Sequence, residues 1–331
     1  MVTTRRVVVG ADVGGTTTRV GVATFAGEVV GLAIGGPGNP NSVGLAGSAA
    51  VIRNVTEEAL EGVEGQVAAV VIALAGGSRA AAEPGFLTAA APRRVGPDPV
   101  LVSDLTAAFY SATPEPRGAV LLAGTGAVAG QVVGTELVQQ RDGWGWLLGD
   151  EGSGFWIGRA SVRSTLAALQ RRTPLGPLAQ DVLAVSGATD YVSLLQVCYQ
   201  QRPAWLAQFA PLVSRHASSD PAARAIAEEA AATLLELLLS LPPRPGEPVV
   251  LAGSVLTVEG PVSRALRRRL TAAQDLDAGA TSVLVATSGM VGALWLALAT
   301  SGGDAADGAE QQRAQHEALA TSAQRWSSTR R

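Results

Sequence analysis

The chain has 331 residues, of which 47 % are hydrophobic and 16 % charged, and its formal net charge is −3. This composition argues against global disorder and supplies enough apolar residues for the cores of two domains. Because the charge is slightly negative and no basic block occurs, we expect no nucleic-acid partner. The apolar runs are too short for a signal peptide or a membrane span, so we expect a soluble, cytoplasmic protein without a membrane partner.

Three residue types are absent or rare, and this excludes several kinds of binding and catalytic site. The sequence contains no lysine, so it cannot hold the GxxxxGK[ST] phosphate loop. Cys198 is the only cysteine, which excludes an internal disulfide and any site built from several thiolates. His216 and His316 are far apart in the sequence, which argues against histidine-based metal or triad chemistry.

The first third of the chain is predicted to alternate short strands with a helix. Gly14 and Gly15 turn the chain after the first strand. Residues 41–63 are predicted to be a helix, with Ser42 as its candidate N-cap. The predicted strands, identified by apolar runs or alternation, are residues 7–13, 17–24, 27–34, 67–77 and 98–104.

A weak internal repeat of this pattern begins at residue 119. Residues 119–138 again contain an apolar strand, a glycine–threonine turn and an alternating strand, and the proline cluster at 113–118 is the expected inter-domain link. Two halves of this kind indicate a duplicated α/β fold. The tail from Ser301 is polar and is expected to be frayed or a loosely held helix. The other predicted elements are helices from 153 to 241, strands at 247–256 and 281–287, and a helix at 289–299.

The stretch DVGGTTTR, residues 12–19, has two interpretations. In the first, its two glycines let the backbone approach a phosphate, N–H groups and the hydroxyls of residues 16–18 donate, and Asp12 holds Mg²⁺ through waters. In the second, it is an ordinary hairpin turn with threonines that favour β structure.

The stretch LAGTGAVAG, residues 122–130, is a second glycine–threonine turn. The spacing of Gly124, Gly126 and Ala129 imitates a dinucleotide-binding fingerprint. However, the following segment is strand-like and Glu136 comes too soon to be the acidic partner. We therefore interpret this turn as a second phosphate-binding hairpin.

Acidic residues mark two further candidates. Asp104 ends a strand, where α/β enzymes place catalytic groups, although a helix N-cap is the alternative interpretation. In DGWGWLLGDEGSGFW, residues 142–156, acids among glycine turns suit a hydroxyl-rich ligand such as a sugar. The alternatives there are core packing for the tryptophans and an acidic helix start for Asp150 and Glu151. In VVLAGSV, Gly253 would let a flat ligand such as adenine approach.

These motifs together resemble a known family. In chain order they are DVGGTTTR, ALAGG, SDLTAA, LAGTGAVA, GWGWLLGDEGSG, VVLAGSV and SGMVGALWLA. They resemble the N-acetylglucosamine kinase-like branch of the sugar kinase/heat-shock/actin superfamily, which includes BadF/BadG-type ATPases and bacterial glucosamine kinases. The resemblance implies an α/β, duplicated ribonuclease-H-like (actin-like ATPase) fold of two domains with an interdomain active-site cleft. The implied parts are a domain 1–114 completed by helix 289–300, a domain 115–288 with a helical insertion, and a polar tail 301–331.

The resemblance also implies roles for individual residues. Asp104 matches the catalytic base that takes the proton from the sugar's 6-hydroxyl, and Asp12 matches the Mg²⁺ site. Residues matching the ATP-phosphate motifs are Gly14, Gly15, Thr16, Thr17, Gly124, Thr125 and Gly126, and those matching the adenosine motif are Gly253 and Ser254. Residues expected to hold the sugar are Asn39, Asp104, Thr125, Gly149 and Glu151, to which the acidic loop adds Asp142 and Asp150.

The chain departs from the family pattern at two places. Ala73 and Ala75 stand where acetylhexosamine kinases tend to have serine, and Asp142 stands where the pattern commonly has glycine. The alanines cannot donate a hydrogen bond to an acetyl group, and Asp142 adds a negative charge. Both differences favour the 2-ammonium of glucosamine over an N-acetyl group. We therefore expect an ATP- and Mg²⁺-dependent kinase that makes glucosamine 6-phosphate and ADP, as a monomer or homodimer.

Three other functions compete with this expectation. The nearest is an N-acetylglucosamine kinase, which differs only in the sugar. An ATPase that activates radical dehydratases would need several cysteines for its iron–sulfur cluster, and Cys198 is alone. A sugar-responsive regulator would need a DNA-binding module, and the predicted first strand leaves no room for one.

Overall fold

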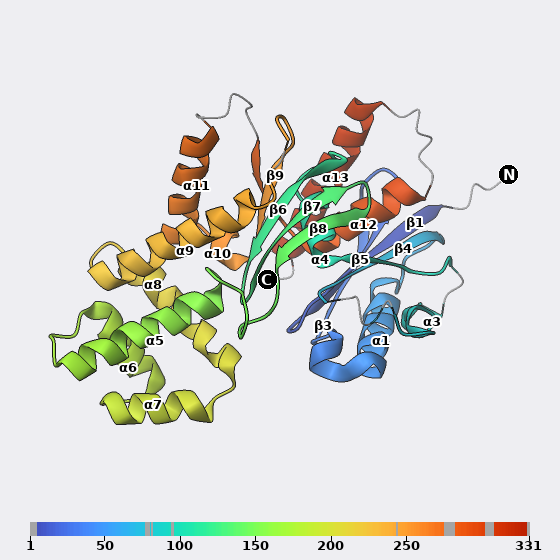
Figure 1. The fold of residues 1–331 in the computed structure, drawn as a ribbon. Coiled ribbons are helices and arrows are strands. Elements are labelled where there is room, and N and C mark those ends of the chain that lie inside the picture. The colour runs from blue at the N-terminus through green and yellow to red at the C-terminus, as the bar shows by residue number, and fades with distance from the viewer. Residues whose placement is uncertain are drawn as a thin grey trace. The chain divides into compact units, whose positions relative to one another are not determined.

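The computed structural model describes residues 5–76, 80, 82–93, 96–242, 244–274, 282–301 and 308–329. The chain forms two compact units, each built around a five-stranded sheet (Figure 1). Unit 1 comprises Met1–Gly118, Val132–Val138 and Ala286–Arg331, and unit 2 comprises Ala119–Gln131 and Gln139–Val285. Two α/β units with repeated strand order agree with the predicted duplication.

The sheet of unit 1 has the order β3-β2-β1-β4-β5. Its strands are β1 (Arg6–Val13), β2 (Thr18–Thr24), β3 (Val29–Gly35), β4 (Gln66–Leu74) and β5 (Val100–Ser103). The first three strands form an antiparallel meander, and β4 and β5 then add in parallel to β1. All five strands predicted from the sequence for this region are therefore confirmed.

Successive residues of β1 face opposite sides of this sheet. Val9 and Ala11 pack in the core that includes α1 (Pro40–Ala59). Gly10 faces α12 (Gly289–Thr300), and a Cβ at this position would collide with the backbone of Leu294. Asp12, two residues further along the strand, consequently lies on the α12 side.

Helix α1 begins differently from the prediction. Asn39, and not Ser42, is the N-cap, because the Asn39 side chain accepts a hydrogen bond from the N–H of Asn41 and Pro40 occupies the first turn. The helix is kinked at Gly44, where φ is 72°. The other helices described in this part of the chain are α3 (Phe86–Ala90) and α4 (Asp104–Tyr110).

Helix α13 (Ala309–Thr329) packs against the rest of unit 1 through both apolar and polar contacts. Leu319 and His316 are buried, the Oγ of Ser322 accepts from the Val29 N–H at 2.9 Å, and the Trp326 indole donates to the Val29 carbonyl at 2.9 Å. The helix thereby satisfies backbone groups of the edge strand β3. The expected helix is therefore found at Ala309–Thr329, but these contacts hold it in place, so the expectation that it is frayed or loosely held is wrong. Residues 302–307 and 330–331 lie outside the described residues.

Truncating the apolar anchor of α13 is expected to destabilise unit 1. Leu319 is fully buried, so Leu319→Ala should lower the free energy of unfolding by about 2–5 kcal/mol. The matched control is Gln312→Ala on the exposed side of the same helix. Urea unfolding of both variants checks this, and equal stabilities would contradict the docked position of α13.

The sheet of unit 2 has the order β10-β9-β6-β7-β8. Its strands are β6 (Arg117–Ala123), β7 (Ala127–Val133), β8 (Glu136–Asp142), β9 (Val249–Ala252) and β10 (Val283–Val285). Phe209, Leu234 and Leu251 lie in its core. The helices of unit 2 are α5 (Gly154–Arg171), α6 (Pro177–Ser186), α7 (Tyr191–Gln200), the 3₁₀ helix η1 (Pro203–Phe209), α8 (Ala210–His216), α9 (Pro221–Leu239), α10 (Ser254–Thr257) and α11 (Pro261–Gln274).

Within the described part of the chain, no single helix is long and apolar enough to cross a membrane. Helices α6 and α7 satisfy the length and composition requirements only when taken together, and the pair is bent by 54°.

Candidate active site

In unit 1, Asp12 lies at the end of β1 against the first turn of α12. A Cβ added to Gly289 would lie 2.8 Å from the carboxyl carbon of Asp12, so only glycine allows this approach. Burial raises the pKa of Asp12 to about 6, the positive charge of Arg19 opposes this shift, and the negative charge of Asp104 adds to it. Asp12 is thus a half-buried carboxylate that is still ionised at neutral pH.

Arg19 is a site residue that the sequence interpretation missed. In the β1–β2 hairpin, Asp12 and Arg19 are direct cross-strand partners, which places both side chains on one face of the sheet. Arg19 supplies a fixed positive charge beside the first glycine turn of a chain that has no lysine. The signal was present in the sequence, because the two residues are equally spaced about the centre of the turn.

The glycine turn between β1 and β2 presents backbone donors to solvent. The N–H of Gly14 donates to the Thr17 carbonyl at 3.0 Å, and the Gly14 carbonyl accepts from the N–H of Asn39 at 3.1 Å. The N–H groups of Gly15, Thr16 and Thr17 have no acceptor among the described residues. Successive free N–H groups in a turn suit an anion such as phosphate.

Asp104 is the first residue of α4 and follows β5 directly. Ser103, and not Asp104, is the N-cap, and its hydroxyl accepts from the Leu105 N–H at 3.2 Å. The Oδ1 of Asp104 also accepts from the Leu105 N–H, at 3.0 Å. Burial raises the pKa of Asp104, while the hydrogen bonds from Leu105 and Ser103 oppose the shift. The helix therefore has a cap without Asp104, which leaves this half-buried carboxylate, with its raised pKa, available for other chemistry.

Asn39, predicted to hold the sugar, has a structural role in unit 1. Its Oδ1 accepts from the Asn41 N–H at 2.8 Å, and its Nδ2 donates to the Ala75 carbonyl at 3.0 Å. These bonds join the start of α1 to the segment after β4. One N–H of the amide remains for a ligand.

In unit 2, the second glycine turn is held by three other segments. The Gly154 N–H at the start of α5 donates to the Gly124 carbonyl at 2.7 Å, and the Asp150 Oδ1 accepts from the Ala127 N–H at 2.9 Å. A Cβ on Gly126 would lie 2.6 Å from the same Asp150 oxygen, and a Cβ on Gly253 would collide with the Ala123 carbonyl. The structure thus brings together motifs that are distant in the sequence.

The loop from Asp142 to Asp150 is organised by its own carboxylates. The Oδ1 of Asp142 accepts from the N–H groups of Trp144 at 3.3 Å and Asp150 at 3.1 Å, and Gly149 packs directly against this carboxylate. Both aspartates have positive φ, 58° and 59°. Burial raises the pKa of Asp150, with a smaller contribution in the same direction from the charge of Asp142 and an opposing one from the Ala127 hydrogen bond.

The side chains of this loop point largely outward. Trp144 is 69 % exposed and Trp146 is 45 % exposed, so core packing is the wrong interpretation for both. Leu147, Leu148 and the predicted sugar ligand Glu151 are exposed as well. The Asp142 carboxylate thus stabilises the conformation of the loop, whereas the tryptophan and leucine side chains are exposed to solvent.

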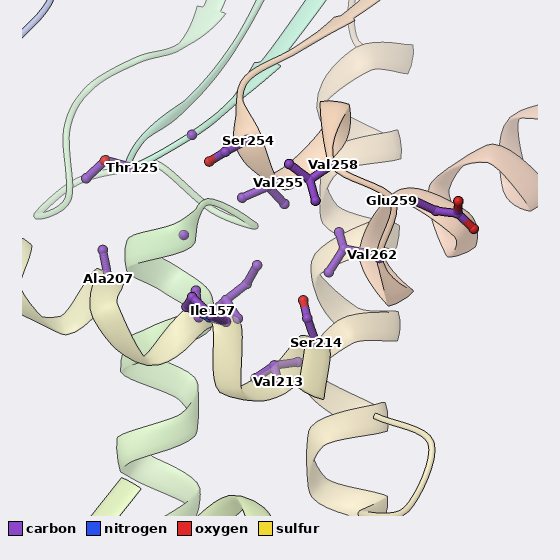
Figure 2. Close-up of a pocket in the computed structure, with 15 residues that line it drawn as sticks. Thr125, Ile157, Ala207, Val213, Ser214, Ser254, Val255, Val258, Glu259 and Val262 are labelled. Carbon is purple, nitrogen blue, oxygen red and sulfur yellow. The ribbon is translucent and has the colours of Figure 1, made fainter. Parts of the chain in front are cut away.

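A cavity of about 350 Å³ lies in unit 2 beside the second turn (Figure 2). Thr125 and Ser254, from the predicted phosphate and adenosine motifs, lie at one side of it, and Ile157 and Val213 supply apolar lining. An apolar pocket with a few polar groups at its edge is typical of a small-ligand site. The lining from α5, η1 and α8 was not predicted, because it comes from three separate helices.

The order and pairing of the strands define the class of protein. Each sheet begins with an antiparallel meander whose first turn is rich in glycine, and parallel strands follow. This is the duplicated ribonuclease-H-like fold of the actin-like ATPases, as the sequence predicted. The model of the BadF/BadG/BcrA/BcrD ATPase family matches residues 9–297, and the chain belongs to this family.

Solved structures support the same fold. A candidate N-acetylglucosamine kinase from Chromobacterium violaceum is 26 % identical with a TM-score of 0.71, over 88 % of this chain and 99 % of that one. A candidate N-acetylglucosamine kinase from Porphyromonas gingivalis is 22 % identical with a TM-score of 0.66, over 89 % and 99 %. A ROK family glucokinase from Streptomyces griseus, in complex with glucose and AMPPNP, is 20 % identical with a TM-score of 0.55, over 88 % and 98 %. No curated protein matches the sequence.

Proposed function

We propose that this protein is an ATP-dependent sugar kinase that phosphorylates the 6-hydroxyl of an amino sugar, with D-glucosamine as the substrate. The observation that carries the proposal is a pair of half-buried carboxylates with raised pKa values, Asp12 at the end of β1 and Asp104 directly after β5, in a unit whose first glycine turn has free N–H groups. Family membership and the 26 % identity to a candidate N-acetylglucosamine kinase support it.

ATP is proposed to use the two glycine turns and the apolar cavity. The free N–H groups of Gly15, Thr16 and Thr17 would bind phosphate oxygens, as would the turn from Gly124 to Gly126. Adenosine would occupy the cavity beside Ser254. The volume of about 350 Å³ and the apolar lining suit a flat base with its ribose.

Asp12 fits the role of Mg²⁺ ligand. Mg²⁺ keeps several waters and needs only one or two carboxylates together with substrate phosphates. The described residues contain no group of three or more His, Cys, Asp or Glu around a common point, and Asp12 by itself meets this smaller requirement. When bound, Mg²⁺ neutralises negative charge on the phosphates, and Arg19 adds a fixed positive charge on the same face.

Asp104 is proposed to be the general base. Its carboxylate takes the proton of the 6-hydroxyl while that oxygen bonds to the γ-phosphorus of ATP. The bond from the γ-phosphorus to the β–γ bridging oxygen breaks, so ADP leaves and the proton stays on Asp104. A pKa raised by burial makes the carboxylate a stronger proton acceptor than a solvated aspartate.

The choice of glucosamine rests on Asp142. Only its Oδ1 is engaged by the loop, so Oδ2 remains for a ligand. A carboxylate about 4 Å from the 2-ammonium contributes on the order of 1–4 kcal/mol, partly offset by desolvation.

Asp142→Asn is expected to raise KM for glucosamine at least several-fold and to leave KM for glucose nearly unchanged. Asparagine keeps an Oδ1 acceptor for the N–H groups of Trp144 and Asp150, so the loop conformation is preserved while the charge is lost. Glucose is the matched control substrate, because it has no charge at C2. Equal effects on both sugars would remove Asp142 from substrate selection.

Initial rates with ATP and glucosamine, N-acetylglucosamine, glucose or mannose test the proposal as a whole. The highest kcat/KM is expected for glucosamine. N-acetylglucosamine as the best substrate would establish the second candidate, which the 26 % identity to the Chromobacterium violaceum protein favours. ATP hydrolysis without phosphorylation of any sugar would overturn the kinase assignment.

A further inference from the structure

A groove between α5 and α9 in unit 2 carries charged side chains that neither the fold nor the proposed reaction uses. Arg159 and Arg163 line its α5 side one helical turn apart, and Glu229 lines its α9 side. The groove has a volume of about 350 Å³. It shares no lining residue with the cavity beside Ser254.

The charges of this groove are unpaired, unlike others in the same unit. Elsewhere in unit 2, Arg268 and Arg269 both pair with Glu228, at 2.8 and 2.9 Å. Neither Arg159 nor Arg163 forms an ion pair or hydrogen bond through its side chain with any described residue. The guanidinium of Arg159 lies 6.0 Å from the centre of the Phe155 ring, a contact that leaves its N–H groups free.

The lining between these charges is apolar. Ile226 is buried, and the indole of Trp156 is half-buried beside it. A ligand in the groove would therefore meet two cations on one side, one carboxylate on the other, and an apolar surface between them. Two neighbouring guanidinium groups suit a phosphate, because each offers several N–H donors in a planar fork.

We propose that this groove binds a small phosphate ester that also carries an ammonium group. The phosphate would lie between Arg159 and Arg163, the ammonium would face Glu229, and the carbon skeleton would lie on Trp156 and Ile226. Glucosamine 6-phosphate belongs to this chemical class, so choosing it as the ligand rests on the proposed function. The groove is then a second site, for the product.

Equilibrium dialysis of labelled glucosamine 6-phosphate against the full chain, without ATP, tests this assignment. The Arg159→Gln/Arg163→Gln double variant is expected to lose one bound equivalent, or to bind it at least tenfold more weakly. The matched control is Arg171→Gln/Arg172→Gln, which removes the same charge from the exposed end of α5 and should bind like the wild type. Binding at the catalytic site is common to all three proteins and cancels in the comparison.

Glu229→Gln tests the ammonium contact separately. The variant should bind glucosamine 6-phosphate only as tightly as the wild type binds glucose 6-phosphate. Glucose 6-phosphate has no ammonium group, so it makes no contact with Glu229 that the substitution could remove. Identical binding by the wild type and the double arginine variant, with unchanged thermal stability, would overturn the groove assignment while leaving kinase activity as evidence for the proposed function. Conversely, the wild type could phosphorylate no sugar while the double arginine variant still binds glucosamine 6-phosphate more weakly than the wild type. That result would support the phosphate-ester site and overturn only the proposed function.

Discussion

Replacing Asp104 by asparagine is expected to lower kcat by roughly 10²–10⁴, the usual effect of removing a general base. KM should change little, and thermal stability should not fall, because Ser103 caps α4 and asparagine can still accept the Leu105 N–H. Any change in stability should be a gain, because burial raises the pKa of Asp104 and ionisation of the carboxylate at neutral pH therefore opposes folding. Steady-state kinetics with ATP and glucosamine, together with a thermal melt, measure both quantities.

Ser103→Ala is the control for this prediction. It removes the cap and should cost about 0.5–2 kcal/mol of stability with a small effect on kcat. The pH profile gives a further check. A base acts only when deprotonated, and burial raises the pKa of Asp104, so kcat/KM should fall as pH drops through that raised pKa. A variant that melts earlier but keeps kcat would show that Asp104 serves only the helix.

Asp12→Asn is expected to abolish most activity and yet to stabilise the protein. Activity should fall because the residue proposed to hold Mg²⁺ loses its charge, and the residual rate should need more Mg²⁺. Stability should rise because the half-buried carboxylate has a pKa of about 6, above its unfolded value of 3.8, so its ionisation at neutral pH opposes folding. The gain is on the order of 1–3 kcal/mol at pH 7.

The pH dependence of this gain has a definite sign. In the wild type the native state binds the proton of Asp12 more tightly than the unfolded state does, so this group's contribution to stability is lost as pH rises from about 3.8 to about 6. The difference between Asp12→Asn and the wild type should therefore grow over that window and vanish below it. Denaturant unfolding at several pH values measures this difference.

Asp181 is the matched control for Asp12. The hydrogen bond from His216, and then that from Arg215, lowers its pKa, which is the opposite direction. Asp181→Asn should therefore destabilise the protein at pH 7, and its contribution should disappear as pH falls rather than as it rises. Stabilisation by both substitutions would mean that the effect at Asp12 is nonspecific.

The amino-acid sequence by itself determined the elements and the main motifs. Apolar runs of strand length, broken by glycine, located the strands from β1 to β9, because alternation and turn chemistry are local properties of the chain. The same local rules located the two glycine turns around Gly14 and Gly124, and the order of the motifs indicated the duplicated fold that the structure has.

Only the tertiary structure decided how side chains far apart in the sequence are used. Ser42 was favoured as an N-cap by composition, but the bond from Asn39 to the Ala75 carbonyl places the start of α1 at Pro40. The polar tail folds as α13 because strand β3 offers Val29 backbone groups to it, a partner that no local pattern reveals.

In the candidate site, too, the sequence predicted the positions of residues, whereas their surroundings depend on the tertiary structure. Asp12 and Asp104 stand out in the sequence because each lies at the end of a predicted apolar strand. Their raised pKa values arise from burial by distant segments, including the Gly289 end of α12 against Asp12. The apolar cavity beside Ser254 draws its lining from several helices that are separate in the sequence, among them α5, η1 and α8. Burial and neighbouring charge depend on the folded chain. Local sequence patterns could therefore locate these carboxylates but could not predict their raised pKa values.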